Sequence, residues 1–391
     1  MKFKKILPII LSCMLLSGCW DKVEIDRRNF IATIAVDSRE DITKDKKLKN
    51  IKPKDSIAKK QTKKINVTYG FPDMSMLGPG KSGTAQDKYI NADAYSMEDA
   101  YSEATAKSSR DLYMGHTKLL ILSSNLLKHK ETIKEIVDYL QRNPIISRTM
   151  QVVASDGVAK DYVEFKPMTE ISAQYYISGL MDNSKRNSRI MSTTLNEFLI
   201  LLSENGNALL PRISIDKDKK ELMLSGAAII KDYELKGYFT PMELMDIQLL
   251  NGKFKVGKKV VYVGGHPVDY VIDGYTKEMK VVEEGNKLVI NVNINLEGQI
   301  SEYYVGKKLL DKNELQTLQN TFNKSISKEC KKVMEDAIGK FGIDPFGTRE
   351  YIEKFKPALW NKIEKNWNEE YKKMSVNVIV KSEIRRIGAV Q

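Results

Sequence analysis

The chain has 391 residues, with 63 lysines and arginines against 51 aspartates and glutamates, and a formal net charge of +12 at pH 7. This length can supply buried cores for two or three domains. Ten lysines and two aspartates lie between Lys44 and Lys64, so this segment carries most of the excess charge. Because no recognition motif accompanies the lysines, the composition argues against nucleic-acid binding.

The first 18 residues have the features of an export signal. Three lysines within the first five residues precede an apolar run over residues 6–16, which is shorter than the roughly 20 residues of a membrane-spanning helix. Ser17 and Gly18 precede Cys19, and this sequence resembles the lipobox at which bacterial lipoproteins receive a diacylglyceryl group on the cysteine thiol. We expect cleavage before Cys19 and an S-diacylglycerol group on its thiol. Acylation of the new amino terminus at Cys19 is a further modification that this signal allows. The alternative is an ordinary secretory signal with a chance cysteine.

A lipid on Cys19 would determine where the protein lies. Each buried methylene contributes about 0.8 kcal/mol, and two acyl chains anchor stably where one binds only marginally. No later apolar stretch approaches membrane length, so we expect a water-soluble body tethered on the outer face of a bacterial membrane. Cys330 is the remaining cysteine of the mature chain, which excludes an internal disulfide.

The lysine-rich segment 44–64 is too polar to pack and predicts a solvated surface loop. A second interpretation is attraction to anionic lipid headgroups, since the segment follows Cys19 by a few dozen residues. Nucleic-acid binding is a poor third interpretation, because an exported protein meets no duplex.

Apolar periodicity predicts a mixed α/β domain in the first part of the chain. Strands are expected at 29–37, 64–71, 116–123 and 149–154, and helices at 96–108 and 125–141. The lysine-rich segment would connect the first two strands, and 74–86 would be a second loop. The order strand, helix, strand from residue 116 to 154 indicates a parallel pair with a crossover helix.

The rest of the chain predicts further helices and many short strands. Helices are expected at 171–181, 194–204, 241–251 and 312–341, and strands at 222–230, 260–263, 268–272, 279–282, 288–296 and 376–387. Asn205-Gly206 should end the helix 194–204. Thr240-Pro241-Met242-Glu243 is a capping box with proline at the first helical position.

These elements predict an α+β (mixed α/β) fold, a three-domain soluble body behind a lipoprotein signal peptide. The expected divisions are 1–18 for the signal peptide, 19–195 for an N-terminal mixed α/β domain with the basic loop 44–64, 196–265 for a small middle module and 266–391 for a C-terminal α+β domain. Stability must come from buried apolar cores, because no disulfide supports them.

Two motifs that could indicate catalysis are incomplete. Gly78–Ser82 resembles a phosphate loop, but Ser75 stands where that motif needs glycine and no convincing helix follows. Ser203 and Ser225 lie in no G-x-S-x-G elbow. The first motif is better explained as a flexible loop, and neither gives a positive signal for catalysis.

Metal and thiol chemistry have no local support either. His116, His129 and His266 are too dispersed to share a metal through a local motif, and Cys330 falls within a predicted helix. We therefore expect no enzyme activity, no metal and no cofactor, and instead a binding or assembly role.

Five blocks of sequence carry a resemblance to a known family. They are Gly18-Cys19-Trp20-Asp21 with Glu24-Ile25-Asp26 and Ile34-Ala35-Val36-Asp37; His116 to Ser123; Leu195 to Leu199 with Leu210-Pro211-Arg212-Ile213; Leu224 to Ala228 with Gly237 and Leu249-Leu250-Asn251-Gly252; and Asp344-Pro345-Phe346-Gly347 with Phe355, Trp360, Trp367, Val376-Asn377-Val378 and Ile384 to Gly388. Their order and spacing resemble the Ger(x)C family, the C-subunit lipoproteins of spore-germination nutrient receptors. The lysine-rich segment 44–64 departs from the family pattern, which affects only that loop.

The resemblance implies three mixed α/β domains without enzyme activity, lipid-anchored on the outer face of the inner membrane of a dormant spore. It implies assembly with two membrane-embedded subunits, A and B, through which the nutrient is mainly sensed. Direct nutrient binding by this subunit stays open. Cys19 is the residue whose role carries over, whereas Trp20, Asp21, Arg385 and Arg386 match the pattern without an assigned role.

Two other classes of protein remain as alternatives. A solute-binding lipoprotein of a transporter would have two similar doubly wound lobes, whereas the C-terminal third here is expected to be strand-rich and then helical. An anchored hydrolase would need a recognisable nucleophile or metal site. The sequence favours a lipid-tethered interaction protein over both.

Overall fold

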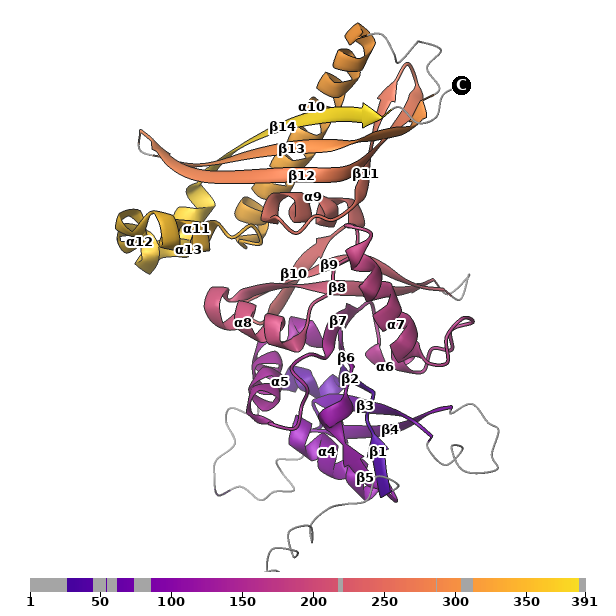
Figure 1. The fold of residues 1–391 in the computed structure, drawn as a ribbon. Helices are drawn as coiled ribbons and strands as arrows, with labels where there is room; N and C mark the ends of the chain where they lie inside the picture. The colour runs from indigo at the N-terminus through magenta and orange to yellow at the C-terminus, as the bar shows by residue number, and fades with distance from the viewer. Residues whose placement is uncertain are drawn as a thin grey trace, which may run out of the picture.

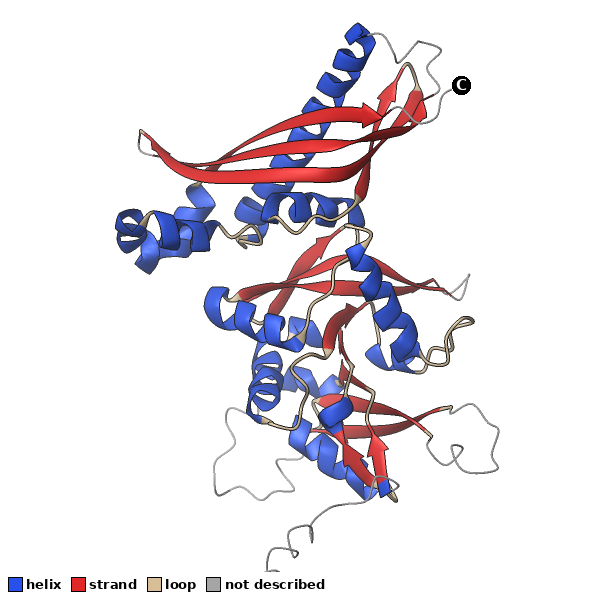
Figure 2. Cartoon of the chain, viewed as in Figure 1, coloured by secondary structure: helices blue, strands red, loops and turns tan. Residues whose placement is uncertain are grey.

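The computed structural model describes residues 27–44, 54, 62–73, 86–216, 221–285, 287–303 and 312–386. Two β-sheets organise them: an eight-stranded large sheet in the lower and middle part of Figure 1, and a four-stranded small sheet above it. Helices flank both sheets (Figure 2), so the predicted α+β class is confirmed. Cys19, Gly78–Ser82 and nearly all of the lysine-rich segment lie outside the described residues.

The large sheet has four parallel strands at its centre. Its strands in spatial order are β10 (Glu234–Phe239), β9 (Glu221–Lys231), β8 (Asn207–Asp216), β7 (Gln151–Ser155), β6 (Leu119–Ser123), β2 (Thr33–Ser38), β3 (Ile65–Pro72) and β4 (Asp87–Ala94). β2, β6, β7 and β8 run parallel, and antiparallel strands extend both edges. Helix α5 (Lys130–Arg142) joins β6 to β7, which confirms the predicted parallel pair with a crossover helix.

Helices cover both faces of the large sheet. Besides α5 they are α4 (Met97–Ala106), α6 (Ala159–Val163), α7 (Ala173–Asp182) and α8 (Leu195–Asn205). The cluster that contains Ile34 and Val36 packs against α4, α5 and α8, whereas the cluster that contains Ala35 packs against α6 and α7. Because successive strand residues point to opposite faces, burial on both sides requires the continuous apolar run seen in β2. A short parallel pair, β1 (Arg28–Phe30) and β5 (Asp111–Tyr113), lies beside this sheet.

Two element boundaries differ from those predicted. β6 begins at Leu119, three residues late, because Met114–His116 form a 3₁₀ turn that Thr117 closes by donating from its amide and hydroxyl to the carbonyl of Met114. Helix α5 begins at Lys130, because a second 3₁₀ turn occupies Leu126–Lys128. Such short turns are common connectors and leave little signal in apolar periodicity.

The small sheet is built from long strands. They are β11 (Gly257–Val263), β12 (His266–Glu284), β13 (Lys287–Tyr303) and β14 (Ser375–Arg386). β11, β12 and β13 are antiparallel, and β14 pairs in parallel with β13. The two short strands predicted at 268–272 and 279–282 are parts of β12, since the polar residues between them pair with β13. Pairing with a neighbour outweighs weak local strand propensity.

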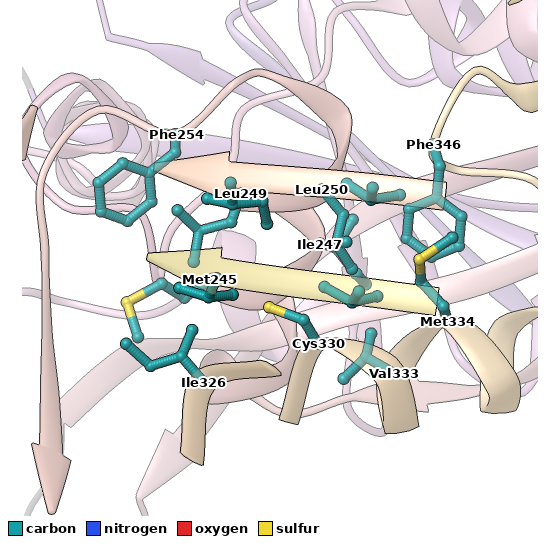
Figure 3. Close-up of a cluster of buried hydrophobic side chains, with 14 of the residues drawn as sticks. Met245, Ile247, Leu249, Leu250, Phe254, Ile326, Cys330, Val333, Met334 and Phe346 are labelled. Atoms are coloured by element: carbon teal, nitrogen blue, oxygen red, sulfur yellow. The ribbon is translucent and has the colours of Figure 1, made fainter. Parts of the chain in front are cut away.

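One face of the small sheet is covered by α9 (Pro241–Asn251) and α10 (Lys312–Glu335). Figure 3 shows Ile247 and Leu250 of α9 in one cluster with Cys330 and Val333 of α10. The predicted helix 312–341 is α10 followed by a π-helical turn at Asp336–Phe341. Three short helices then lead to β14: α11 (Thr348–Phe355), α12 (Pro357–Ile363) and α13 (Trp367–Lys373).

Residues 196–265 contribute to both sheets. Strands β8, β9 and β10 complete the large sheet, while α9 and β11 belong to the cluster under the small sheet. The division into three domains stays a prediction.

The outer edge of β14 is covered by side chains of α10. Alternate backbone N–H groups of β14, at residues 380, 382 and 384, donate to Ser327 Oγ (3.0 Å), Asn323 Oδ1 (2.6 Å) and Gln319 Oε1 (3.2 Å). These acceptors are four residues apart and therefore share one face of the helix. They satisfy a strand edge that could otherwise pair with another chain.

Asn323→Ala is expected to lower the free energy of unfolding by about 1–3 kcal/mol, because it leaves the amide of Ser382 without its acceptor and removes one of the two acceptors of the Ser382 hydroxyl, the other being the carbonyl of Gln319. Asn320→Ala, at an exposed position of the same helix, is the matched control and should change stability by less than about 0.5 kcal/mol. Urea unfolding followed by circular dichroism measures both. Equal losses in the two variants would show that the edge contacts contribute nothing.

Candidate functional site

A cleft of about 480 Å³ lies between the large sheet and the layer under the small sheet. We call it the junction cleft. Its walls come from the segment 184–193, helix α8, the start of strand β8, helix α9 and the loop 344–347. Apolar side chains, including Leu209, Ile247 and Phe346, form much of the surface, and Lys253 stands among the polar lining residues. Such a cleft suits a partly apolar partner group.

The loop 184–193 is fixed to α9 by hydrogen bonds. The side-chain amide of Gln248 donates to the carbonyls of Ser188 (2.8 Å) and Ile190 (2.9 Å). The backbone amide of Lys255 donates to Ser188 Oγ at 2.9 Å. Because α9 is buried over the whole stretch Leu244–Leu250, a polar residue within it requires a partner. Sequence reasoning missed Gln248, although a glutamine inside an apolar helix is the signal that could have found it.

The loop 344–347 is organised by the carboxylate of half-buried Asp344. Asp344 Oδ1 accepts from the amide of Phe346 and the hydroxyl of Tyr371, both at 3.2 Å, and Oδ2 accepts from the amide of Arg349 at 2.8 Å. Burial raises the pKa of Asp344 above its usual value. Gly347 has a φ of 78°, which allows the chain to turn into α11. Asp344 therefore shapes the cleft wall by closing the loop on itself and on α13.

Two hydrogen bonds join the segment 342–349 to the large sheet and to helix α8, which covers it. The guanidinium of Arg349 donates to the carbonyl of Glu204 at the end of α8. Lys231 Nζ, from β9, donates to the carbonyl of Gly342 at 2.6 Å. Since both contacts cross the junction, they hold the two halves of the protein together beside the cleft.

A buried charge network lies behind the cleft wall. Lys259 Nζ, from β11, is 2.5 Å from Asp246 Oδ1 of α9 and 2.6 Å from Glu329 Oε2 of α10. Cys330 Sγ lies 3.7 Å from Asp246 Oδ1. Burial raises the pKa of Asp246 to about 6 and raises that of the Cys330 thiol well above its usual value. A thiol that stays protonated is a poor nucleophile, so this network serves packing.

The histidines singled out from the sequence are dispersed in the structure. His116 packs against the rings of Phe30 and Tyr113, with centroid distances of 5.1 and 5.6 Å. His129 precedes α5, and His266 begins β12. Within the described ranges no group of three or more histidine, cysteine, aspartate or glutamate side chains could hold a metal ion. In the same ranges no helix is long and apolar enough to cross a membrane.

Three of the five sequence blocks meet at the junction cleft. Glu197 from the third block, Asn251 from the fourth and the loop Asp344–Gly347 from the fifth all line it. These residues are far apart in the chain, so sequence spacing could not bring them together. The first and second blocks end elsewhere, at Asp37 and Ser123 on the large sheet.

Two family models match the chain. One is described as the spore germination protein N-terminal domain and covers residues 21–215. The other is described as spore germination B3/GerAC like, C-terminal, and covers residues 225–388. The division between them falls at the β8–β9 hairpin, so the large sheet contains strands from both.

Curated relatives and a solved structure extend the comparison. Spore germination protein YndF of Bacillus subtilis (strain 168) is 26% identical, with 100% of this chain and 99% of that protein covered. Spore germination protein B3 of the same organism is 23% identical, with 96% and 95% covered. The crystal structure of the GerBC protein has a TM-score of 0.59 at 20% identity, with 82% of this chain and 93% of that chain covered.

The fold and these matches define a two-sheet α+β protein of a spore germination class, which is not a known class of enzymes. The chain belongs to the Ger(x)C, or GerAC-like, spore germination family, because the two family domains together cover nearly all residues from 21 to 388. The resemblance drawn from the five sequence blocks is thereby confirmed.

Proposed function

We propose that this chain is the lipid-anchored C subunit of a nutrient germinant receptor, needed for nutrient-triggered spore germination. The observation that carries the proposal is similarity over the whole length: relatives named spore germination proteins align with 100% and 96% of the chain. The chain would work through assembly with two membrane-embedded subunits, A and B, rather than through chemistry of its own.

In this proposal Cys19 carries an S-diacylglycerol group and holds the body on the outer face of the spore inner membrane. The lipobox at residues 16–19 supports the anchor, and the family N-terminal domain starts at residue 21. The family match would therefore begin two residues after the lipid-bearing cysteine. Two acyl chains supply a stable anchor without a membrane-spanning helix.

The alternative, a solute-binding lipoprotein of a transporter, predicts two similar lobes. Here the large sheet has eight strands with four parallel ones at its centre, while the small sheet has four strands and a different order. The two halves are unlike each other, which favours the receptor subunit.

The test uses spores of a strain that lacks this gene and the other nutrient receptors. The gene is returned as wild type, as Cys19→Ala, or as Cys13→Ala, which makes the same substitution inside the signal peptide. The A and B subunits are expressed in every strain. We expect the wild type and Cys13→Ala to restore nutrient-triggered dipicolinate release. Cys19→Ala should fail and should leave the membrane fraction, while non-nutrient triggers work in every strain.

Two results would contradict the proposal. Full rescue of germination by Cys19→Ala would contradict the part of the proposal that requires a lipid anchor on Cys19. No response with the wild-type gene, although the protein is present in the membrane with both partners, would remove the germination role and favour the solute-binding alternative.

A further inference from the structure

A second pocket, of about 300 Å³, lies away from the junction cleft at the carboxyl ends of β2, β6 and β7. It is lined by residues that end or follow these three parallel strands and by residues of β3 and β4. Its volume is at the lower end of the roughly 300–1,000 Å³ of small-molecule sites. In open α/β sheets this edge is where ligands bind, because the loops after the strands converge there. We call it the strand-end pocket.

Its wall is built on Asp37, the last residue of the first sequence block. Asp37 is only 8% exposed and accepts hydrogen bonds from the amides of Ala159 (2.7 Å) and Lys160 (3.0 Å), and from the Ser123 hydroxyl. The amide of Gly157 donates to Ser124 Oγ at 3.2 Å. These bonds join the ends of β2, β6 and β7, so the pocket has a rigid wall. Asp37 itself is fully engaged by these donors and acts as a positioning residue.

Two cations stand at the pocket. Arg39 is about half exposed and uses one Nη2 donor on Asp93 at 2.6 Å, which leaves further guanidinium donors. Lys160 is 38% exposed, with its Nζ 3.6 Å from Glu164. Asp37, the one carboxylate among the described lining residues, is buried and already hydrogen-bonded, so the exposed charged groups of this lining are the two cations. They suit an anionic group.

The remaining lining groups are neutral and polar. Asn66, Asn91 and Asn125 line the pocket, and no described residue that lines it is aromatic. Asn91 Oδ1 is covered and has no hydrogen-bond partner among the described residues, and the same is true of the hydroxyl of Thr68, which is opposite Asn91 in the β3–β4 pairing. The side-chain amides of the three asparagines that line the pocket offer the kinds of donor and acceptor that suit the hydroxyl groups of a ligand.

We propose that the strand-end pocket binds a small anionic polyol, such as a sugar acid or a sugar phosphate. Arg39 and Lys160 receive the anionic group, and the asparagine side chains and Ser38 receive the hydroxyls. The absence of an aromatic platform among the described lining residues disfavours flat, stacked ligands such as nucleobases. This inference does not rest on the proposed function, because it concerns binding by the chain alone.

The test is calorimetric titration of the full-length chain in detergent with D-gluconate, glucose 6-phosphate and the uncharged polyol sorbitol. We expect saturable binding of at least one of the two anions, and sorbitol at least about tenfold weaker, equivalent to about 1.4 kcal/mol. Binding of gluconate alone would identify the anionic group as a carboxylate, and binding of the phosphate alone as a phosphate ester.

The double variant Arg39→Gln/Lys160→Gln should weaken binding of the anions about tenfold or more. The matched control is Lys134→Gln/Arg142→Gln, which also removes one lysine charge and one arginine charge, but from the exposed face of α5. It should bind the anions as the wild type does. Thermal unfolding checks that both variants fold. The proposal is overturned if neither anion binds, if sorbitol binds equally well, or if both double variants bind alike.

Discussion

Gly226→Ala is expected to prevent stable folding, with a loss of more than about 4 kcal/mol in the free energy of unfolding. A Cβ at this position would lie 2.0 Å from the carbonyl oxygen of Phe239 and 2.9 Å from the carbonyl carbon of Thr240. Gly226 also has a φ of 99°, a conformation that L-residues with side chains rarely adopt. Because both obstacles are backbone, no side-chain rearrangement relieves them.

The position of Gly226 explains why the contact is so close. It lies in β9 where the pairing with β8 shifts register between Pro211 and Ile213, and β-bulges commonly place glycine at such a position. Phe239 ends β10 and Thr240 caps α9. The absence of a side chain at Gly226 therefore allows β9 to lie close to the connection between β10 and α9, a helix that lines the junction cleft.

The measurement compares soluble yield and urea unfolding of Gly226→Ala with those of Gly179→Ala. Gly179 lies inside α7, has no positive φ, and nothing lies within 4 Å of its expected Cβ. The same substitution there should stabilise the protein by about 0.5–1 kcal/mol, because alanine loses less backbone entropy in a helix. A folded Gly226→Ala variant with less than about 1 kcal/mol of destabilisation would contradict the argument.

Lys259→Met is expected to cost about 3–5 kcal/mol of unfolding free energy at pH 8, because it leaves buried Asp246 without its positive partner. The loss should shrink towards pH 5. Burial raises the pKa of Asp246 to about 6 in the folded protein, so ionisation of this carboxyl removes stability as pH rises through that value. Without Lys259 the pKa of Asp246 should rise further, so the carboxyl is neutral at pH 5, whereas at pH 8 it must either ionise without a positive partner or stay protonated well above its usual pKa, and both cost stability.

Two further variants make this prediction specific. Lys259→Met/Asp246→Leu should recover most of the lost stability, since apolar groups of similar size can replace a buried ion pair. Arg142→Ala breaks an ion pair whose side chains are 79% and 57% exposed and should cost less than about 1 kcal/mol at either pH. Urea unfolding at pH 5 and pH 8 measures all of them. A loss for Lys259→Met that does not change with pH would contradict ionisation of Asp246 as its cause.

Local signals predicted many elements well. The capping box at Thr240 and Glu243 is present, with Thr240 Oγ1 accepting from the amide of Glu243 and Glu243 Oε2 accepting from the amide of Thr240. The helix ends at Asn205-Gly206 and Asn251-Gly252 are also present, with left-handed Gly206 and Gly252. These features could be predicted because each depends on residues within one or two helical turns.

Other elements had too little local signal. β4 is polar at several positions and was not predicted, yet it pairs along its whole length with β3. β8 was not predicted either, and it continues through Pro211 because the register shift beside this proline accommodates it. In both cases hydrogen bonds to a distant strand decided the outcome.

By itself, the amino-acid sequence determined the α+β class, the parallel β6–β7 unit and the family, because these follow from short-range periodicity, capping and blocks in a fixed order. It also motivates the lipid anchor on Cys19, which stays a proposal. Only the tertiary structure decided which blocks meet: Glu197, Asn251 and Asp344 at the junction cleft, and Asp37 and Ser123 at the strand-end pocket. The physical reason is that sheet order and packing between distant elements depend on long-range pairing and burial, which no local pattern records.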